Sequence, residues 1–164
     1  MREELDKLLC EKYPKMMVNR HKGMQETCMC WGFDCGDGWY NILNQLMGNI
    51  QHHIDWKEKQ RNWTIEWNKE HPNEPREVPE LVQQVTLDQV KEKFGTLRFY
   101  YTGGNDYISG MVAMAESMSG VTCEGCGNSG ERRGGGWVHT YCDPCEIKRE
   151  AERAAYAKEN GLEE

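Results

Sequence analysis

The longest regular pattern of hydrophobic residues along the chain has the spacing of an amphipathic α-helix. Its apolar positions are Trp39, Leu43, Leu46, Met47, Ile50 and Ile54. Residues at this spacing share one face of a helix, so the segment is predicted to bury that face. Its end has two alternatives: the helix continues through Trp56, Trp63 and Trp67, or it breaks near residue 60. Pro72 ends it at the latest, because proline lacks the amide hydrogen that a further turn requires.

Two shorter segments also have helical spacing. The first is predicted near the N-terminus and stops before Pro14; its apolar face consists of Leu5, Leu8, Leu9 and Tyr13. The second is "NDYISGMVAMAESMSG", and its inward-facing residues are predicted to be Ile108, Met111, Val112, Ala115 and Met118. Asn105 or Asp106 is the predicted N-cap, because a short polar side chain there accepts a hydrogen bond from the first helical amides.

Strands and loops are predicted from alternation and from turn residues. "TCMCWGF" alternates as a strand does, and the following "DCGDG" is predicted to be a turn. "TLRFYYT" is a strand by composition. "HPNEPREVPE" contains three prolines and mixed charges, so it is predicted to be a connecting loop.

The segment "TLDQVKEKFG" has two interpretations. Thr86 and Gln89 form a capping box and Gly95 could stop a short helix, so a helix is one alternative. The other is the first arm of a hairpin that turns at Phe94–Gly95 into the strand "TLRFYYT". The hairpin is favoured.

Four cysteines stand in two C-x-x-C pairs, Cys123/Cys126 and Cys142/Cys145, with fifteen residues between the inner members. This spacing is typical of a zinc site in which each pair bends into a knuckle and offers two thiolates. A redox site would need only one pair, and disulfides would need an oxidising compartment. The cysteines are therefore predicted to hold one structural zinc ion, since four thiolates leave no coordination position open for catalysis.

The residues around these cysteines predict a knuckle, a hairpin and a helix in that order. Glycines at 134–136 and "WVHTYC" indicate the hairpin, and Asp143 is the predicted N-cap of a helix that ends at Asn160–Gly161. This order resembles a treble-clef zinc finger. His139 is an alternative metal ligand, but a place in the hairpin is favoured for it.

Together these elements predict an α+β fold: a small antiparallel sheet packed by helices, with an appended treble-clef-like zinc finger that uses four cysteine ligands. Residues 1–121 are expected to form the α+β domain, and residues 122–164 the finger with its C-terminal helix. The residues expected to be buried are Trp39, Leu43, Leu46, Ile50, Phe99, Met111 and Ala115.

Composition limits the function classes. The chain has 164 residues and a net charge of −7 with histidines neutral, which argues against a broad electrostatic grip on nucleic acid. Eight cysteines without an export signal predict a reducing cytoplasm, and no apolar run reaches the length of a membrane span. Six tryptophans and nine methionines can fill a core, but they also build adaptable binding surfaces.

Other candidate sites are weaker. A second metal site could use Cys28, Cys30 and Cys35 with Cys10 or His21, although packing in the core is favoured for these cysteines. His52 and His53 point about 100° apart on a helix, so they are expected to be exposed and not to share a metal. No serine-hydrolase elbow, metalloprotease motif, P-loop or carboxylate pair is recognisable, so the protein is not predicted to be an enzyme.

The best candidate for a ligand site is "YYTGGNDY", where a strand leads through two glycines into a helix N-terminus. Backbone amides at such a junction suit a phosphate, a tyrosine can stack on a base and an arginine can pair with phosphate. The candidate ligand-binding residues are Arg98, Tyr100, Tyr101, Gly103, Gly104, Asn105 and Asp106. The alternative is a glycine turn that only caps the helix. Arg132 and Arg133 could likewise contact a phosphate, but a solvated hairpin tip is favoured for them.

Three blocks of the sequence resemble small uncharacterised zinc-binding accessory proteins of tailed bacteriophages. The blocks are "CMCWGFDCGDGWYNIL", "VKEKFGTLRFYYTGGNDYISGM" and "CEGCG…CDPC", which together span residues 28–146. The resemblance implies a phage accessory protein that acts in the host bacterial cytoplasm. It supplies no catalytic residues.

The favoured function is therefore a zinc-stabilised binding protein that counteracts host defence. Its partner would be a nucleotide-derived signal that it sequesters or a host protein that it blocks, and a homodimer is one way to build the site. The alternatives are a zinc-finger protein that binds nucleic acid and an enzyme such as a phosphodiesterase or nuclease. A membrane partner is not expected.

Overall fold

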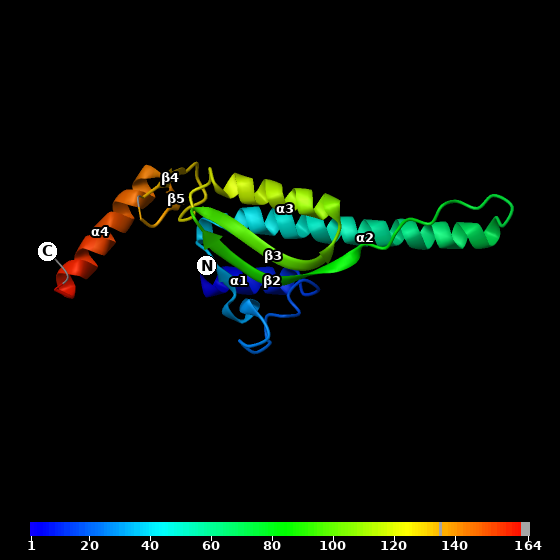
Figure 1. The fold of residues 1–164 in the computed structure, drawn as a ribbon, viewed down its shortest axis with the longest axis horizontal. Helices are drawn as coiled ribbons and strands as arrows, with labels where there is room; N and C mark the ends of the chain where they lie inside the picture. The colour runs from blue at the N-terminus through cyan, green and yellow to red at the C-terminus, as the bar shows by residue number, and fades with distance from the viewer. Residues whose placement is uncertain (135, 162–164) are drawn as a thin grey trace.

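The computed structural model describes residues 1–134 and 136–161 (Figure 1). The helices are α1 (Glu3–Lys12), α2 (Tyr40–Glu70), α3 (Asp106–Ser119) and α4 (Asp143–Glu159). The strands are β1 (Phe33–Asp34), β2 (Gln83–Lys93), β3 (Thr96–Gly104), β4 (Glu131–Arg133) and β5 (His139–Tyr141), and two 3-10 helices are η1 (Cys28–Trp31) and η2 (Asp37–Trp39). This confirms the α+β class. No helix in the described residues is long and apolar enough to cross a membrane.

The main sheet has the strand order β1-β2-β3. The long strands β2 and β3 form an antiparallel hairpin, so the hairpin prediction is confirmed and the helix alternative for this segment is wrong. Phe94 and Gly95 make its turn with positive φ angles of 55° and 78°, the left-handed conformation that a tight two-residue hairpin loop requires. The expectation of a purely antiparallel sheet is corrected, because β1 pairs with β2 in parallel.

One hydrophobic core lies between the sheet and the helices. Of the residues expected to be buried, those that are buried are Trp39, Leu43, Leu46, Ile50, Phe99 and Ala115. Met111 is only half-buried, and Leu8 and Met118, which were expected to face inward, are about half exposed. Met111 and Met118 line a groove between α2 and α3. The apolar face of α3 is therefore wider than the part of it that the core buries.

Helix α3 covers the outer edge of β3. Its Glu116 side chain accepts a hydrogen bond from the Phe99 amide at 2.9 Å, and its Ser119 hydroxyl accepts one from the Leu97 amide at 2.8 Å. An edge strand with unpaired amides tends to pair with other chains. Here α3 satisfies those amides, and it ends shortly before the turn that contains Cys123 and Cys126.

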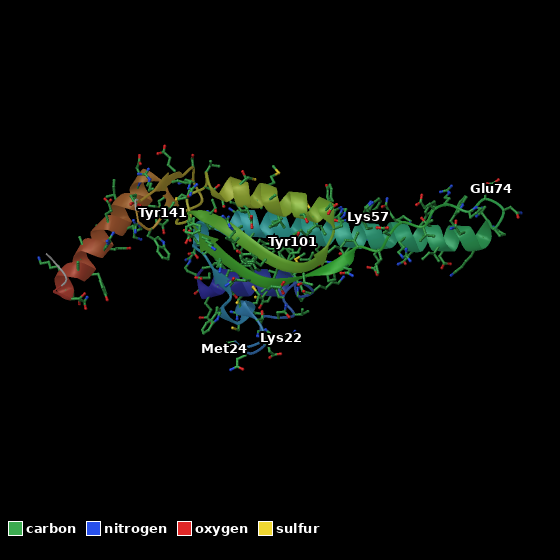
Figure 2. All side chains as sticks on the ribbon, in the orientation of Figure 1. Lys22, Met24, Lys57, Glu74, Tyr101 and Tyr141 are labelled. Atoms are coloured by element: carbon green, nitrogen blue, oxygen red, sulfur yellow. The ribbon has the colours of Figure 1, made fainter. Side chains whose placement is uncertain are left out.

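Helix α2 continues to Glu70, so the alternative break near residue 60 is wrong. Its second half extends beyond the body as an arm, residues 56–70, accompanied by the predicted loop (Figure 1). Figure 2 labels Lys57, where the arm leaves the body, and Glu74 at its tip. The Arg76 guanidinium from the loop lies 4.0 Å from the centre of the Trp67 ring.

Two local predictions are corrected. "TCMCWGF" is mostly the 3-10 helix η1 and not a strand, because the Thr27 side chain accepts a hydrogen bond from the Met29 amide at 3.0 Å and caps a helical turn. Only Phe33–Asp34 pair with the sheet. Helix α4 begins one residue earlier than expected, with Cys142 at the N-cap instead of Asp143 and with no side-chain cap.

Candidate metal centre

The two C-x-x-C pairs converge at one point in the fold. Cys123 and Cys126 lie in the turn after α3, Cys142 caps α4 and Cys145 lies in its first turn. The four Sγ atoms all lie within 4.8 Å of one another, and those of Cys126 and Cys142 are 3.6 Å apart. Among the described residues, this is the one group of three or more cysteine, histidine or acidic side chains close enough to hold a metal ion.

The sulfur separations fit a metal and do not fit disulfides. Four sulfurs at about 2.3 Å from a tetrahedral zinc ion lie about 3.8 Å from one another. A disulfide requires about 2.05 Å between its sulfurs. The observed 3.6 Å between Cys126 and Cys142 is close to the first value, so the four cysteines could hold one metal ion.

Backbone hydrogen bonds shape the first knuckle and favour thiolates in it. The Gly127 amide donates to the Cys123 carbonyl at 2.8 Å, and the Cys123 amide donates to the Asn128 carbonyl at 2.7 Å. Burial raises the pKa of the Cys123 thiol, but hydrogen bonds from the backbone amides of Cys142 and Cys126 outweigh it and lower that pKa to about 7. Burial and the neighbouring thiols raise the pKa of Cys145, so metal binding there must displace a proton.

His139 is not one of the ligands. It is buried in β5, its Nε2 lies 2.8 Å from Glu146 Oε2, and its Nδ1 lies 3.1 Å from the Trp137 carbonyl oxygen. Burial raises the pKa of Glu146, but hydrogen bonds from Arg149 and His139 lower it to below its ordinary value. With both ring nitrogens engaged, His139 joins the hairpin to α4, which confirms its predicted place in the hairpin.

The finger segment docks on the body through very close backbone contacts. The Gly38 amide donates to the Glu124 carbonyl at 2.8 Å, and a Cβ atom on Gly38 would lie 2.2 Å from the Cys123 carbonyl oxygen. The Trp39 indole donates to the Thr122 carbonyl at 2.8 Å. On the other side, the Thr140 hydroxyl donates to the Gly95 carbonyl at 2.6 Å. The start of α2 and the β2–β3 turn therefore both hold the finger.

Two surfaces near the finger were not anticipated from the sequence. Trp137 and Glu92 border both of two adjoining hollows of about 370 and 260 Å³. The larger one is also lined by Asp34 and by Glu124, which is buried and accepts a hydrogen bond from the Gly36 amide at 2.8 Å. Burial raises the pKa of the Glu124 carboxyl. These residues lie far apart in the sequence, so no local pattern predicts that they line one hollow. The high tryptophan count was the one sequence signal of such a binding surface.

The candidate ligand residues are distributed along β3 and the start of α3. Arg98 is folded back on its own strand, where its Nη1 donates to Thr96 Oγ1 at 2.6 Å and to the Leu97 carbonyl at 2.7 Å. Six residues of extended strand, or about 20 Å, separate it from Gly104. The structure therefore does not bring the arginine to the helix N-terminus.

The other candidate ligand residues have separate surroundings. Tyr100 is exposed beside Lys91, whereas the Tyr101 hydroxyl lies 3.0 Å from Ser109 Oγ on α3. Gly103 lies against the backbone of β2, and Gly104 and Asn105 border a hollow of about 570 Å³. The Asn105 side chain accepts a hydrogen bond from the Ile108 amide at 3.2 Å, so its predicted capping role is confirmed; Asp106 is the exposed first residue of α3.

The weaker candidates do not assemble into a second metal site among the described residues. Cys35 is buried, Cys28 is exposed, and the Cys30 thiol donates to the Thr27 carbonyl at 3.1 Å. The group with Cys10 or His21 is not close enough to hold an ion. His53 is not fully exposed as expected: it stacks on Tyr107 at 4.5 Å between ring centres.

The two hairpin arginines have structural contacts. Arg132 donates to the Phe94 carbonyl at 2.9 Å, and Arg133 donates to the Tyr141 carbonyl at 2.9 Å and pairs with Asp143. Both bonds tie the finger hairpin to its neighbours.

Comparisons with protein-family models, curated proteins and solved structures found no match to this chain.

Replacing Gly38 with alanine should separate the finger from the body. The new Cβ would approach the Cys123 carbonyl oxygen and the Gly127 amide nitrogen, both of them backbone atoms that cannot move aside without shifting the knuckle. We expect Gly38→Ala to lower the free energy of unfolding by about 2 kcal/mol or more in urea denaturation. Gly110→Ala is the matched control, because nothing lies within 4 Å of its Cβ position in α3, and it should be neutral or stabilising. Equal losses in both variants would contradict the importance of this contact.

Proposed function

We propose that this protein is a zinc-stabilised binding protein and not an enzyme. The observation that carries the proposal is the convergence of four cysteine sulfurs within 4.8 Å. Four thiolates are a donor set that prefers zinc, and a closed set of this kind stabilises a fold and leaves no position for a substrate. The order knuckle, hairpin β4–β5 and helix α4 supports the assignment of a treble clef.

Exposed aromatic residues support a binding role for the junction between the finger and the β2–β3 turn. Trp137 is 77% exposed, and Phe94 is 64% exposed. Tryptophan is enriched among residues that dominate protein–protein binding energies. Phe94 also has a positive φ of 55°, which a bulky side chain adopts only with strain, and strained residues cluster at functional sites. We therefore assign these two rings to partner binding.

The charge next to the rings indicates the chemistry of the partner. Three carboxylates line the larger hollow beside Trp137: Asp34, Glu92 and Glu124. Arg149 and the Met1 ammonium also line it, but the guanidinium is paired with Glu146 at 3.3 Å and the ammonium donates to the Phe33 carbonyl at 3.1 Å. Complementary charge would be a lysine or arginine beside an apolar residue on the partner. The net charge of the whole chain is −7, so it has the same sign as the charge of these carboxylates.

In the setting implied by the resemblance to phage accessory proteins, the partner is a protein of the host's defence in the bacterial cytoplasm. The chain would act by covering a basic and apolar segment of that protein. Blocking of this kind requires a stable surface and no chemistry, which agrees with a closed metal site.

Freshly purified protein is expected to contain one zinc ion per chain by elemental analysis. Cys142→Ser should lose this zinc and unfold the C-terminal segment in circular dichroism, because metal binding and folding share one free energy there. Cys28→Ser removes an exposed cysteine outside the cluster and should keep the zinc. Protein that contains no zinc, or equal loss in both variants, would sink the assignment.

A host protein that copurifies from phage-infected cells should be lost on Trp137→Ala and weakened about tenfold or more on Glu92→Gln. Glutamine keeps the carbonyl oxygen that accepts the hydrogen bond from the Gly95 amide, so this variant removes charge and preserves the turn. Trp31→Ala is the matched control, since Trp31 is 67% exposed and lines neither hollow. The affinities should be measured by calorimetry with the purified partner. Retention of the partner by Trp137→Ala would contradict the proposed surface.

Sequestration of a nucleotide-derived signal is a second candidate, favoured by the hollow at the start of α3. Lys57, Glu80, Gly104 and Asn105 border this hollow of about 570 Å³. The helix N-terminus and the lysine suit a phosphate, whereas the Glu80 carboxylate opposes one. Arg98 would have no part in it, because its guanidinium is bound to its own strand.

Calorimetry with cyclic and ADP-ribose-type nucleotides tests this candidate. Binding that is weakened about tenfold by Lys57→Ala and unchanged by Arg98→Ala would support the hollow. A loss caused by Arg98→Ala, with zinc content intact, would instead support a site around that residue. No heat with any nucleotide would leave the protein partner as the remaining proposal.

A further inference from the structure

Helix α2 carries a seven-residue repeat that runs from the body into the arm. Its members are Ile42, Asn49, Trp56 and Trp63. Residues seven apart return to nearly the same face of a helix, so the four form one uncharged stripe. The first two line the groove between α2 and α3, and the last two lie on the arm.

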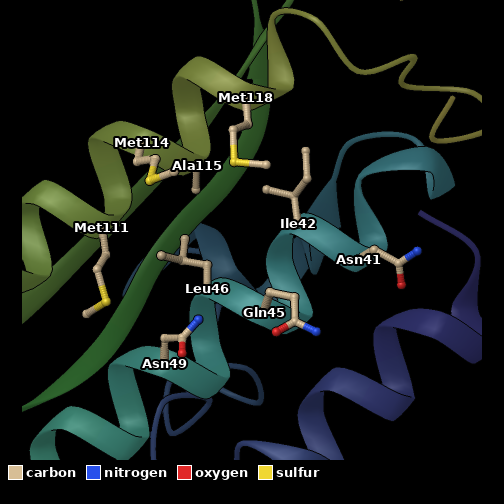
Figure 3. Close-up of a pocket in the computed structure, with 9 residues that line it drawn as sticks. All are labelled: Asn41, Ile42, Gln45, Leu46, Asn49, Met111, Met114, Ala115 and Met118. Carbon is tan, nitrogen blue, oxygen red and sulfur yellow. The ribbon is translucent and has the colours of Figure 1, made fainter. Parts of the chain in front are cut away.

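The groove end of this stripe is apolar and open. It has a volume of about 350 Å³, and three methionines of α3 form its second wall: Met111, Met114 and Met118. In Figure 3, Met118 lies toward Ile42, and Met111 lies toward Asn49. No charged side chain lines this groove in the part of the chain that the structure describes.

The arm end of the stripe is only partly covered, since the Arg76 guanidinium of the loop lies 5.0 Å from the centre of the Trp63 ring. Trp56 and Trp63 are 52% and 54% exposed, and Thr64 is the one buried residue among the described residues 56–70. A helical segment of this length is marginal in water without tertiary packing, and the accompanying loop packs on only one side of it. About half of each tryptophan side chain therefore faces solvent, on a helix that would gain stability from a partner.

We propose that a second copy of this chain covers the stripe, with the two α2 helices antiparallel about a two-fold axis between His52 and His53. With this axis, each residue of one copy lies opposite a residue of the second copy, and the two residue numbers add up to 105. Ile42 then faces Trp63 of the second copy, and Asn49 faces Trp56 of the second copy. All four members of the stripe are paired, and two-fold symmetry makes each pairing twice.

The pairing matches the chemistry of the two ends. Trp63 of the second copy meets Ile42 and Met118, and Trp56 of the second copy meets Asn49 and Met111, so indole rings contact methionine sulfurs, which attract aromatic rings. Four tryptophans and two methionine-lined walls can bury on the order of 1,000 Å², the lower bound of a specific interface. The flanking Gln45 meets Gln60 of the second copy, so no like charges are brought together along the stripe.

The polar member of the stripe fixes the register. In this alignment Asn49 faces Trp56 of the second copy, whose indole N–H can donate a hydrogen bond to the Asn49 amide oxygen. A shift of one turn would set Asn49 against a different residue and remove this pairing. The stripe on α2 is also separate from the proposed partner surface around Trp137 and Phe94. This inference therefore does not depend on the proposed function.

Sedimentation equilibrium of the full chain across the micromolar range tests the dimer. The unsubstituted protein should be dimeric, and the double variant Trp56→Ala/Trp63→Ala should raise the dimer dissociation constant at least about thirtyfold. Trp31→Ala, an exposed tryptophan outside the stripe, should leave it unchanged. Zinc content and circular dichroism should be equal in all of these proteins.

A charge pair tests the register. Trp56→Lys alone should give monomers, and adding Asn49→Glu should restore the dimer, because the two positions face each other across the axis. Adding Gln45→Glu instead should not restore it, since that residue faces position 60. The proposal is overturned if the unsubstituted chain is monomeric across the micromolar range. This holds whether or not another protein occupies the groove. A dimer that survives loss of both tryptophans, or equal rescue by the two glutamates, overturns it as well.

Discussion

The close approach of Gly38 to the turn that contains Cys123 and Cys126 is the constraint on which the rest of the structure depends. The Gly38 amide bonds to the Glu124 carbonyl at 2.8 Å, and the space beside its α-carbon is filled by the knuckle backbone. The same short segment follows β1 and begins α2. The sheet, the longest helix and the four thiols are therefore positioned from one place. The buried Trp39, whose indole bonds to the Thr122 carbonyl, extends this contact into the core.

A second contact joins the finger to the β2–β3 turn and orients the exposed rings. The Thr140 hydroxyl bonds to the Gly95 carbonyl, and Arg132 bonds to the Phe94 carbonyl. Helix α3 satisfies the amides at the edge of β3 and then leads into Cys123, so the hairpin and the knuckle are held from both ends. Because these hydrogen bonds hold the β2–β3 turn to the finger, Phe94 and Trp137 are exposed on the same side of the molecule as one surface. Pre-organisation of this kind lowers the entropy lost on binding.

The proposed partner surface and the proposed dimer stripe lie on different parts of the molecule. The first is at the finger, and the second extends along α2 to the arm (Figure 1). A dimer through α2 would present two finger surfaces, so an oligomeric target could engage both and gain affinity without any new contact. The arm tryptophans would then serve assembly, and the finger aromatics would serve recognition.

The sequence by itself determined most of the local elements and the four cysteines that could hold a metal ion. The spacing of Cys123, Cys126, Cys142 and Cys145, the helical period from Trp39 and the cap at Asn105 each depend on neighbours along the chain, so each was predictable. Only the tertiary structure decided how those elements meet. It placed the turn with Cys123 and Cys126 against Gly38, and it gathered Asp34, Glu92, Glu124 and Trp137 around one hollow. Such placements depend on packing between segments that are distant in sequence, and no local pattern encodes that packing.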